Sequence, residues 1–315
     1  MNIITPAIKH AEDHIKVYIA ARYNGHRANP NAPNANQAKA GAEPYPYHLE
    51  SYHYTGNGRY DELIRSNHHR MFMDSGAFSA FTLGATINLD KYARYLTNCS
   101  DYIEVASNVD VIGAGMEKES YDNQKALESM KLPVQVCPVH HARDRDEWLV
   151  RYLDAGYDYL FLGGMVPEST GYLIDWLDHI WDKYLALPDG TARIKVHGFG
   201  LTTFELMDRY PWYSVDSTSW VMISMFGNIL MNVKGKPRAI SLSEKSSTLK
   251  QENKSFWNMD KATQDHLRAI IVENGFTPED LAANFGARDS WNIRFFNRYM
   301  ERDKPLFERR AVTFF

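Results

Sequence analysis

The feature that most constrains the fold of this chain is a regular alternation of short apolar, β-rich runs with amphipathic stretches. Eight runs have the length and composition of strands, and they cover residues 16–22, 71–75, 102–107, 133–138, 157–163, 193–198, 213–217 and 237–241. Five stretches between them carry apolar residues three and four positions apart, as helices do, and these cover 89–96, 121–130, 145–155, 173–187 and 203–210. Such alternation is typical of βα units around a parallel sheet, and eight strands favour an α/β fold of the (β/α)8 TIM-barrel type over a doubly wound sheet.

The length of the chain, 315 residues, fits one barrel of about 250 residues with an extension. We expect the barrel domain to span residues 1–245. Within it, 28–47 is rich in Asn, Ala and Pro and has no periodicity, which predicts a long mobile loop. Residues 246–315 are expected to form a helical extension packed on the barrel, because Thr277 and Pro278 give the signal of a helix start.

The composition is that of a globular chain, with 44% hydrophobic and 23% charged residues. No run of about 18 apolar residues occurs, so we expect no membrane partner and a cytoplasmic protein. The two cysteines, Cys99 and Cys137, are too few for a disulfide framework or a cysteine-built zinc site. The net charge of −4 lacks the overall basic character of nucleic-acid-binding proteins, so that class requires basic residues gathered locally.

Acidic residues follow three of the predicted strands, at Asp74, Asp110 and Asp216. The carboxyl ends of barrel strands meet at one mouth, where active sites lie, so we expect the three carboxylates to converge there. Glycines that would let a flat ligand approach the main chain occur nearby, at Gly76, Gly163, Gly164, Gly198 and Gly200. Carboxylates accept hydrogen bonds from the N–H edge of a purine and act as nucleophile or general acid and base. These parts suit cleavage of a guanine glycosidic bond, and a two-carboxylate sugar hydrolase fits them as well.

Three segments resemble the ordered signature of the tRNA-guanine transglycosylase superfamily. They are Asp74-Ser75-Gly76-Ala77-Phe78, then Leu162-Gly163-Gly164-Met165, then His197-Gly198-Phe199-Gly200 followed by a helix and Tyr213-Ser214-Val215-Asp216-Ser217-Thr218. The similarity covers residues 70–220 or so, and it is greater to the phage and bacterial branch that inserts 7-deazaguanines into DNA, the DpdA-like DNA transglycosylases. Three motifs in the right order on a predicted barrel are more specific than any one of them.

The resemblance implies a base exchange that uses two catalytic aspartates and neither a metal nor a cofactor. Asp216 would be the nucleophile that displaces guanine and forms a covalent intermediate, and Asp74 would handle the proton of the departing and arriving bases. Asp110 would recognise the base, over a backbone platform made by Gly163 and Gly164. The other substrate-binding residues expected on this basis are Ser75, Gly76, Phe78, His140, Met165, His197 and Gly198. His140 falls where the tRNA enzymes carry a base-contacting glutamine.

Two departures from the tRNA enzymes point away from a standard member of that group. Their zinc site of three cysteines and a histidine follows the nucleophile, whereas no cysteine follows Cys137 here. The stretch 217–220 also differs from the one that contacts tRNA. The expected partners are therefore double-stranded DNA and a free 7-deazaguanine base such as the 7-cyano form, in the host cytoplasm if the gene is a phage's. Phosphates are expected to bind a local basic surface made of Lys234, Lys236, Arg238 and Lys245.

Other interpretations stay open at this point. The chain could be a tRNA-guanine transglycosylase without the zinc module, or a non-catalytic barrel that binds nucleic acid. The aspartates could cap turns or helices, and the glycines could serve sharp turns. The pairs His68-His69 and His140-His141 are not expected to bind a metal, because adjacent residues on a strand face opposite ways. The oligomeric state is left open.

Overall fold

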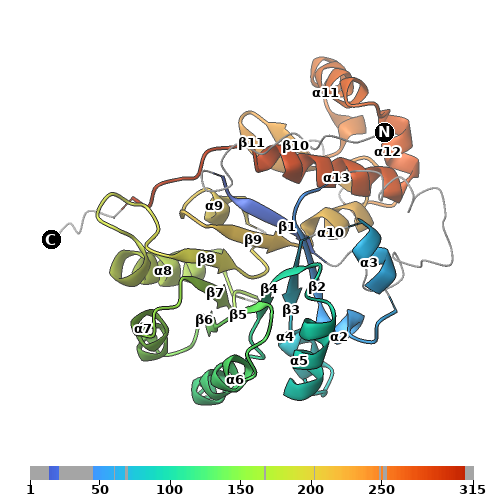
Figure 1. Cartoon of the computed structure of the whole chain (residues 1–315). Coiled ribbons are helices and arrows are strands. Elements are labelled where there is room, and N and C mark those ends of the chain that lie inside the picture. Colours follow the sequence, from blue (N-terminus) through green and yellow to red (C-terminus); the bar gives the residue numbers. More distant parts are fainter. Residues whose placement is uncertain are drawn as a thin grey trace, which may run out of the picture. The chain divides into compact units, whose positions relative to one another are not determined.

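The chain forms two compact units that differ in architecture (Figure 1). The computed structural model describes residues 14–20, 45–59, 61–67, 70–166, 168–201, 203–247, 250 and 254–308. The first unit consists of Met1–Asn24, Tyr47–Ser217 and Met300–Phe315, and the second consists of Gly25–Pro46 and Thr218–Tyr299.

A sheet of nine parallel strands, counted over the described residues, builds the first unit. The strands are β1 (Lys16–Ala20), β2 (His48–Ser51), β3 (Met71–Asp74), β4 (Ile103–Ser107), β5 (Gln135–Cys137), β6 (Val139–His141), β7 (Tyr159–Gly163), β8 (Lys195–Gly198) and β9 (Ser214–Ser217). Their order in the sheet is β5-β4-β3-β2-β1-β9-β8-β7-β6. Strands that are consecutive in the chain are thus neighbours in the sheet except for β5 and β6, and β1 pairs with β9.

The two ends of this order, β5 and β6, are parts of one strand that Pro138 interrupts. On one side, the Cys137 carbonyl accepts the Asn108 N–H at 2.9 Å, and on the other the Pro138 carbonyl accepts the Phe161 N–H at 3.0 Å. Proline has no N–H to donate, so the ladder breaks at this residue. The sheet is a nearly closed barrel, and the predicted (β/α)8-like TIM-barrel fold is confirmed.

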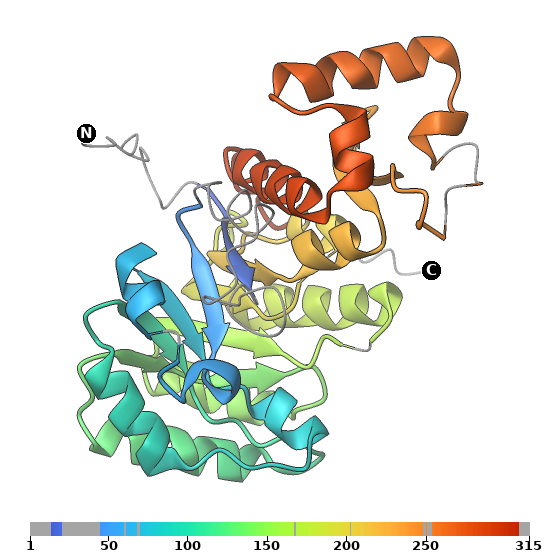
Figure 2. The ribbon, with the colours of Figure 1, turned by 90° about the vertical axis from the view of Figure 1, so that its right-hand side faces the viewer.

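Helices alternate with these strands, as predicted, and lie on the outside of the barrel, where Figure 2 shows them in colours from blue through green to yellow-green. They are α2 (Tyr52–Thr55), α3 (Asp61–Asn67), α4 (Ala77–Thr82), α5 (Leu89–Asn98), α6 (Glu117–Ser129), α7 (Asp146–Asp154), α8 (Thr170–Ile180), the π-helical turn η2 (Trp181–Leu185) and α9 (Phe204–Met207). All five predicted helices overlap these elements. The side chains of Asn88 and Ser169 cap α5 and α8 by accepting backbone N–H groups.

Aromatic side chains fill the barrel interior beneath the carboxyl ends of the strands. The rings of Tyr18 and Phe161 lie 5.4 Å and 4.8 Å from that of Phe72, measured between centroids. Phe72 is fully buried, and truncating such a side chain to alanine costs about 3–5 kcal/mol. This packed interior gives the residues at the mouth a rigid support.

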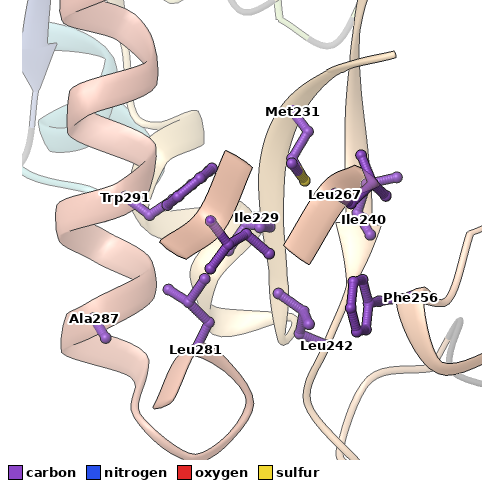
Figure 3. Close-up of a cluster of buried hydrophobic side chains, with 10 residues drawn as sticks. Ile229, Met231, Ile240, Leu242, Phe256, Leu267, Leu281, Ala287 and Trp291 are labelled. Atoms are coloured by element: carbon purple, nitrogen blue, oxygen red, sulfur yellow. The ribbon is translucent and has the colours of Figure 1, made fainter. Parts of the chain in front are cut away.

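The second unit has a hydrophobic core of its own (Figure 3). It contains α10 (Ser219–Met225), the antiparallel strands β10 (Asn228–Val233) and β11 (Lys236–Ser241), the 3-10 turn η3 (Phe256–Asn258), and the helices α11 (Lys261–Glu273), α12 (Pro278–Ala283) and α13 (Phe285–Tyr299). In Figure 3 the side chains of Ile229, Phe256 and Trp291 are part of this cluster. The predicted helix start is confirmed, because the Thr277 hydroxyl accepts the Asp280 N–H at 3.0 Å at the head of α12.

One strand prediction is wrong. The run at 237–241 is not the eighth barrel strand, because β11 pairs antiparallel with β10 in a separate sheet. The remaining barrel strand is β2, in which His48 and Glu50 are buried. The His48 Nε2 lies 3.2 Å from the Glu50 Oε1. Two ionisable residues in a four-residue strand conceal the apolar pattern that marks the other strands.

The division of the chain also differs from the expected boundary at residue 245. The units separate between Ser217 and Thr218, and the chain returns to the barrel unit from Met300 onwards. The hairpin β10–β11 belongs with the C-terminal helices because its apolar side chains pack against α11, α12 and α13.

Three smaller expectations concern the loop, the thiols and the membrane. The loop predicted at 28–47 lies outside the described residues except for 45–47. Cys99 and Cys137 are buried free thiols. Every helix in the described part of the chain is too short or too polar to cross a bilayer.

Candidate active site

The three predicted carboxylates belong to the carboxyl end of the parallel sheet. Asp74 is the last residue of β3, Asp216 is the third residue of β9, and Asp110 follows β4. The charges of Asp110 and Asp216 both raise the pKa of Asp74, so each of them acts on the Asp74 carboxyl group. The structure therefore brings together the acids that the sequence placed at separate strand ends.

Asp74 is held by two hydrogen bonds in a mostly buried position. Its Oδ2 accepts the Gly76 N–H at 3.0 Å, and its Oδ1 accepts the Ser107 hydroxyl at 3.1 Å. The Ser107 oxygen itself accepts the Ser75 N–H at 2.7 Å, so its own proton is left to point at Asp74. Burial, then the charges of Asp110 and Asp216, raise the pKa of Asp74 to about 7 in spite of these bonds. A carboxyl group with this pKa both donates and accepts a proton near neutrality.

The turn that follows Asp74 requires glycine at position 76. Gly76 has φ = 75° and stands at the N-terminus of α4. A Cβ atom there would overlap the Ser51 hydroxyl and the His53 side chain. The geometry that points the Gly76 N–H at Asp74 thus excludes any other residue.

Asp216 has one oxygen held and one open. Its Oδ1 accepts the Gly200 N–H at 2.7 Å and lies 3.3 Å from the His197 Nε2. Burial lowers the pKa of His197, which the nearby Asp216 only partly offsets, so the imidazole is neutral and donates through Nε2. No described residue hydrogen-bonds Oδ2 of Asp216 in this structure. That oxygen is therefore available to a ligand.

A chain of hydrogen bonds runs inward from His197 to a buried serine. Its Nδ1 lies 2.7 Å from the Ser214 hydroxyl, which lies 2.6 Å from the Tyr159 hydroxyl. The order serine, histidine, aspartate is that of hydrolase triads. Here, however, Ser214 and His197 are completely buried and only Asp216 reaches the mouth. The chain of hydrogen bonds orients Asp216 and fixes the histidine tautomer, and Ser214 has no access to a substrate.

The third acid, Asp110, is paired with His141. The His141 Nε2 lies 2.9 Å from the Asp110 Oδ2. The backbone N–H of His141 donates to the Asp144 Oδ2 at 2.8 Å. Burial lowers the pKa of His141, but the bond and charge of Asp110 and the charge of Asp144 raise it by more, so the net shift is upward. The charged imidazole is thus more stable than that of an isolated histidine, and the ring holds one oxygen of Asp110 in place.

His140, which the sequence suggested as a base contact, is elsewhere. It is fully buried and stacks on Trp176 of α8, with 6.5 Å between ring centroids. Burial, together with the charge of His141, lowers its pKa to about 4. Because side chains alternate along β6, His141 faces the mouth while His140 faces the helices. The expectation for His140 is corrected, and His141 is the residue that sequence reasoning missed.

Gly163 and Gly164 make room for His141. A Cβ atom on Gly163 would lie 2.8 Å from the His141 Cδ2, and one on Gly164 would lie 3.0 Å from the His141 Cβ. Gly164 also has φ = 67°, which favours glycine by itself. The pair therefore has a packing role, and its role as a platform for a base stays a prediction.

The other predicted contacts differ in accessibility. Phe78 on α4 is 52% exposed and open to a stacking partner. Ser75 and Met165 are buried, and Gly198 packs against Leu201 and Trp212, with 3.3 Å from its Cβ position to each. Of these four, only Phe78 has a surface that a ligand can reach without rearrangement.

The four residues predicted to hold phosphates all belong to the second unit. They are exposed and lie on or near β10 and β11, at Lys234, Lys236, Arg238 and Lys245. Their role stays a prediction. His68 and His69 lie outside the described residues, and no group of three metal-ligating side chains occurs within the described part of the chain.

Comparison with known proteins gives no assignment. No protein-family model matches the chain, and no curated protein matches it.

Proposed function

We propose that the barrel is a base-exchange enzyme that replaces guanine in DNA with a 7-deazaguanine through a covalent aspartyl intermediate. The observation that carries this proposal is the pairing of two unlike carboxylates at one mouth. Asp216 has one oxygen held by Gly200 and His197 and the other open, and Asp74 has a pKa of about 7. Groups with these properties suit a nucleophile and a general acid and base.

In the first step the open oxygen of Asp216 attacks the anomeric carbon of the target nucleotide. The bond from that carbon to the guanine nitrogen breaks, its electron pair goes to the base, and protonated Asp74 supplies the proton. An ester between Asp216 and the sugar results. The Gly200 N–H and His197 keep the other carboxylate oxygen in position during this change.

In the second step the incoming base takes the place of guanine. Ionised Asp74 removes the ring N–H proton, the ring nitrogen attacks the anomeric carbon, and the carboxylate of Asp216 leaves. Two inversions give overall retention of configuration. Asp74 ends the cycle protonated, as it began, so a pKa near the working pH serves both steps.

Base recognition falls to Asp110 and His141. The Oδ2 of Asp110 is fixed by His141, which leaves Oδ1 to accept N–H groups from the edge of a guanine-like base. The exposed ring of Phe78 provides a stacking surface nearby on α4. The target nucleotide has to leave the duplex to reach this site, at a cost of a few kcal/mol.

The choice of DNA over tRNA rests on the cysteines. Both are buried thiols in the barrel unit, so no cysteine is present to build the zinc module of the tRNA enzymes. This supports DNA as the polymer that exchanges its guanine.

Transfer of a labelled base tests the proposal. Wild-type protein incubated with labelled 7-cyano-7-deazaguanine should transfer the label to duplex DNA and not to tRNA. Asp216→Asn should abolish transfer, while the matched variant Asp122→Asn, on the exposed face of α6, should retain it. Label on tRNA alone would contradict the substrate, and full activity of Asp216→Asn would contradict the mechanism.

A further inference from the structure

A cavity of about 510 Å³ lies at the amino-terminal end of the barrel strands, opposite to the end that carries the aspartates. It is lined by residues 191–195, Pro211, Tyr213 and 303–306, all of which belong to the first unit. Lys195 begins β8, and Tyr213 directly precedes β9. A cavity of this size is typical of sites for small molecules, which occupy about 300–1,000 Å³.

The wall formed by 303–306 is anchored to the barrel unit. Asp303 forms an isolated β-bridge with His14, and the Phe307 N–H donates to the Gly190 carbonyl at 2.9 Å. The buried Phe307 ring stacks on Tyr210, with 5.9 Å between centroids and 19° between planes. The cavity is therefore bounded by packed residues on this side.

Three ammonium groups gather around the ring of Tyr213. The Nζ atoms of Lys16, Lys195 and Lys304 lie 4.4, 5.1 and 5.2 Å from its centroid. Arg193 adds a further cation to the lining, against a single acid, Asp303. The lining is thus predominantly positive, although the chain as a whole has a net charge of −4.

Lys16 is unusual among these cations because it is 94% buried, with 6% of its surface exposed. Its Nζ donates to the Tyr213 hydroxyl at 2.6 Å, and no carboxylate of the described residues lies within ion-pair distance of it. Lys195 likewise has no carboxylate partner within that part of the chain. A buried ammonium group is costly without a compensating negative charge, and aromatic faces compensate only in part. Lys16 is not itself a lining residue, so it adds positive charge beside the shared Tyr213 ring, and Lys195 is a lining cation that can bind an anion.

We propose that this cavity binds a small molecule that carries phosphate groups, with Lys195, Lys304 and Arg193 as its phosphate contacts. Lysine ammonium groups act as compact point charges toward phosphate oxygens. The concave lining suits a ligand of up to nucleotide size, and it is separate from the site of base exchange. This inference does not depend on the proposed function.

Isothermal titration of the full chain with pyrophosphate, AMP and adenosine tests the proposal. Pyrophosphate and AMP should bind, whereas adenosine, which has no phosphate, should not. Lys195→Met keeps the aliphatic stem and removes the charge, and it should weaken both affinities by about tenfold or more. Lys195→Arg should restore most of the affinity, and Lys91→Met, an exposed lysine on α5, should leave it unchanged.

Each contrary result overturns the proposal. Failure of the wild-type protein to bind pyrophosphate or AMP at millimolar concentration would do so, as would unchanged affinity in Lys195→Met. Binding of a single-stranded oligonucleotide that Lys195→Met weakens, with no binding of pyrophosphate or AMP, would show a surface for a polymer instead of a small-molecule site.

Discussion

Replacing Asp74 by asparagine should make the protein more stable at alkaline pH. The pKa of this carboxyl is about 7 in the folded chain against an ordinary value of 3.8. The difference of about 3 units corresponds to about 4 kcal/mol, at about 1.4 kcal/mol for each unit. That free energy is the cost of ionising Asp74 inside the folded structure, and asparagine does not ionise.

The effect should depend on pH in a specific way. Below about pH 4 the carboxyl is protonated in both the folded and the unfolded chain, so the cost is absent. It grows as the pH rises from 4 to 7 and is complete above pH 7. Asparagine also loses one acceptor for the Gly76 N–H or the Ser107 hydroxyl, at about 1 kcal/mol. The variant should therefore be about 3 kcal/mol more stable than wild type at pH 8 and about 1 kcal/mol less stable at pH 4.

Urea unfolding followed by tryptophan fluorescence at pH 4, 6 and 8 measures this difference. Asp122→Asn is the control, since Asp122 is exposed on α6 and should show no comparable crossing. A variant at position 74 that is less stable than wild type at pH 8, or that differs by the same amount at every pH, would refute the reasoning about this carboxyl.

Three further predictions concern the same mouth. Ser107→Ala should raise the pKa of Asp74 by about 1 unit, since a hydrogen bond to a charged group is worth about 1.5–3 kcal/mol. Carbon-13 NMR titration of the Asp74 carboxyl measures this rise, and the control Ser107→Thr, which keeps the hydroxyl, should not show it. His141→Asn should raise the KM for the incoming base by about tenfold or more, because the bond to Asp110 is lost. His140→Leu should leave KM within about twofold, because that ring faces the helices. Equal effects of the two variants would contradict the assignment of His141 to the mouth. Gly163→Ala should reproduce the KM defect of His141→Asn with a smaller change in kcat, because its Cβ would lie 2.8 Å from the imidazole, and a wild-type KM would show that the imidazole can yield.

Much of the barrel could be predicted because its strands are marked by apolar runs between glycines and amphipathic helices. The strand β2 could not, since two of its four residues are the buried pair His48 and Glu50. The run at 237–241 has the composition of a strand and is one, but composition does not specify a partner, and its partner is β10. That partner is adjacent in the chain, since the two strands are joined by the two-residue turn Lys234-Gly235, in which both residues have positive φ. The turn is a local hairpin signal that the sequence-based prediction did not use.

The candidate site shows a similar limit. The positions of Asp74, Asp110 and Asp216 followed from the rule that parallel strands end at one mouth. The choice between His140 and His141 needed the register, because a shift of one residue exchanges the two faces of a strand. Pro138 interrupts this strand between β5 and β6. The inward–outward alternation of side chains in β5 therefore does not tell which of the two histidines in β6 faces the mouth. The Ser107 bond to Asp74 joins two strands and has no local signal in the sequence.

The central claim is that Asp216 becomes covalently attached to the sugar during base exchange. Wild-type protein incubated with duplex DNA, denatured, digested and examined by mass spectrometry should yield a nucleotide adduct on the peptide that contains Asp216. Adding the free 7-deazaguanine before denaturation should discharge that adduct. No adduct under conditions that give base transfer, or an adduct on a different residue, would contradict the account.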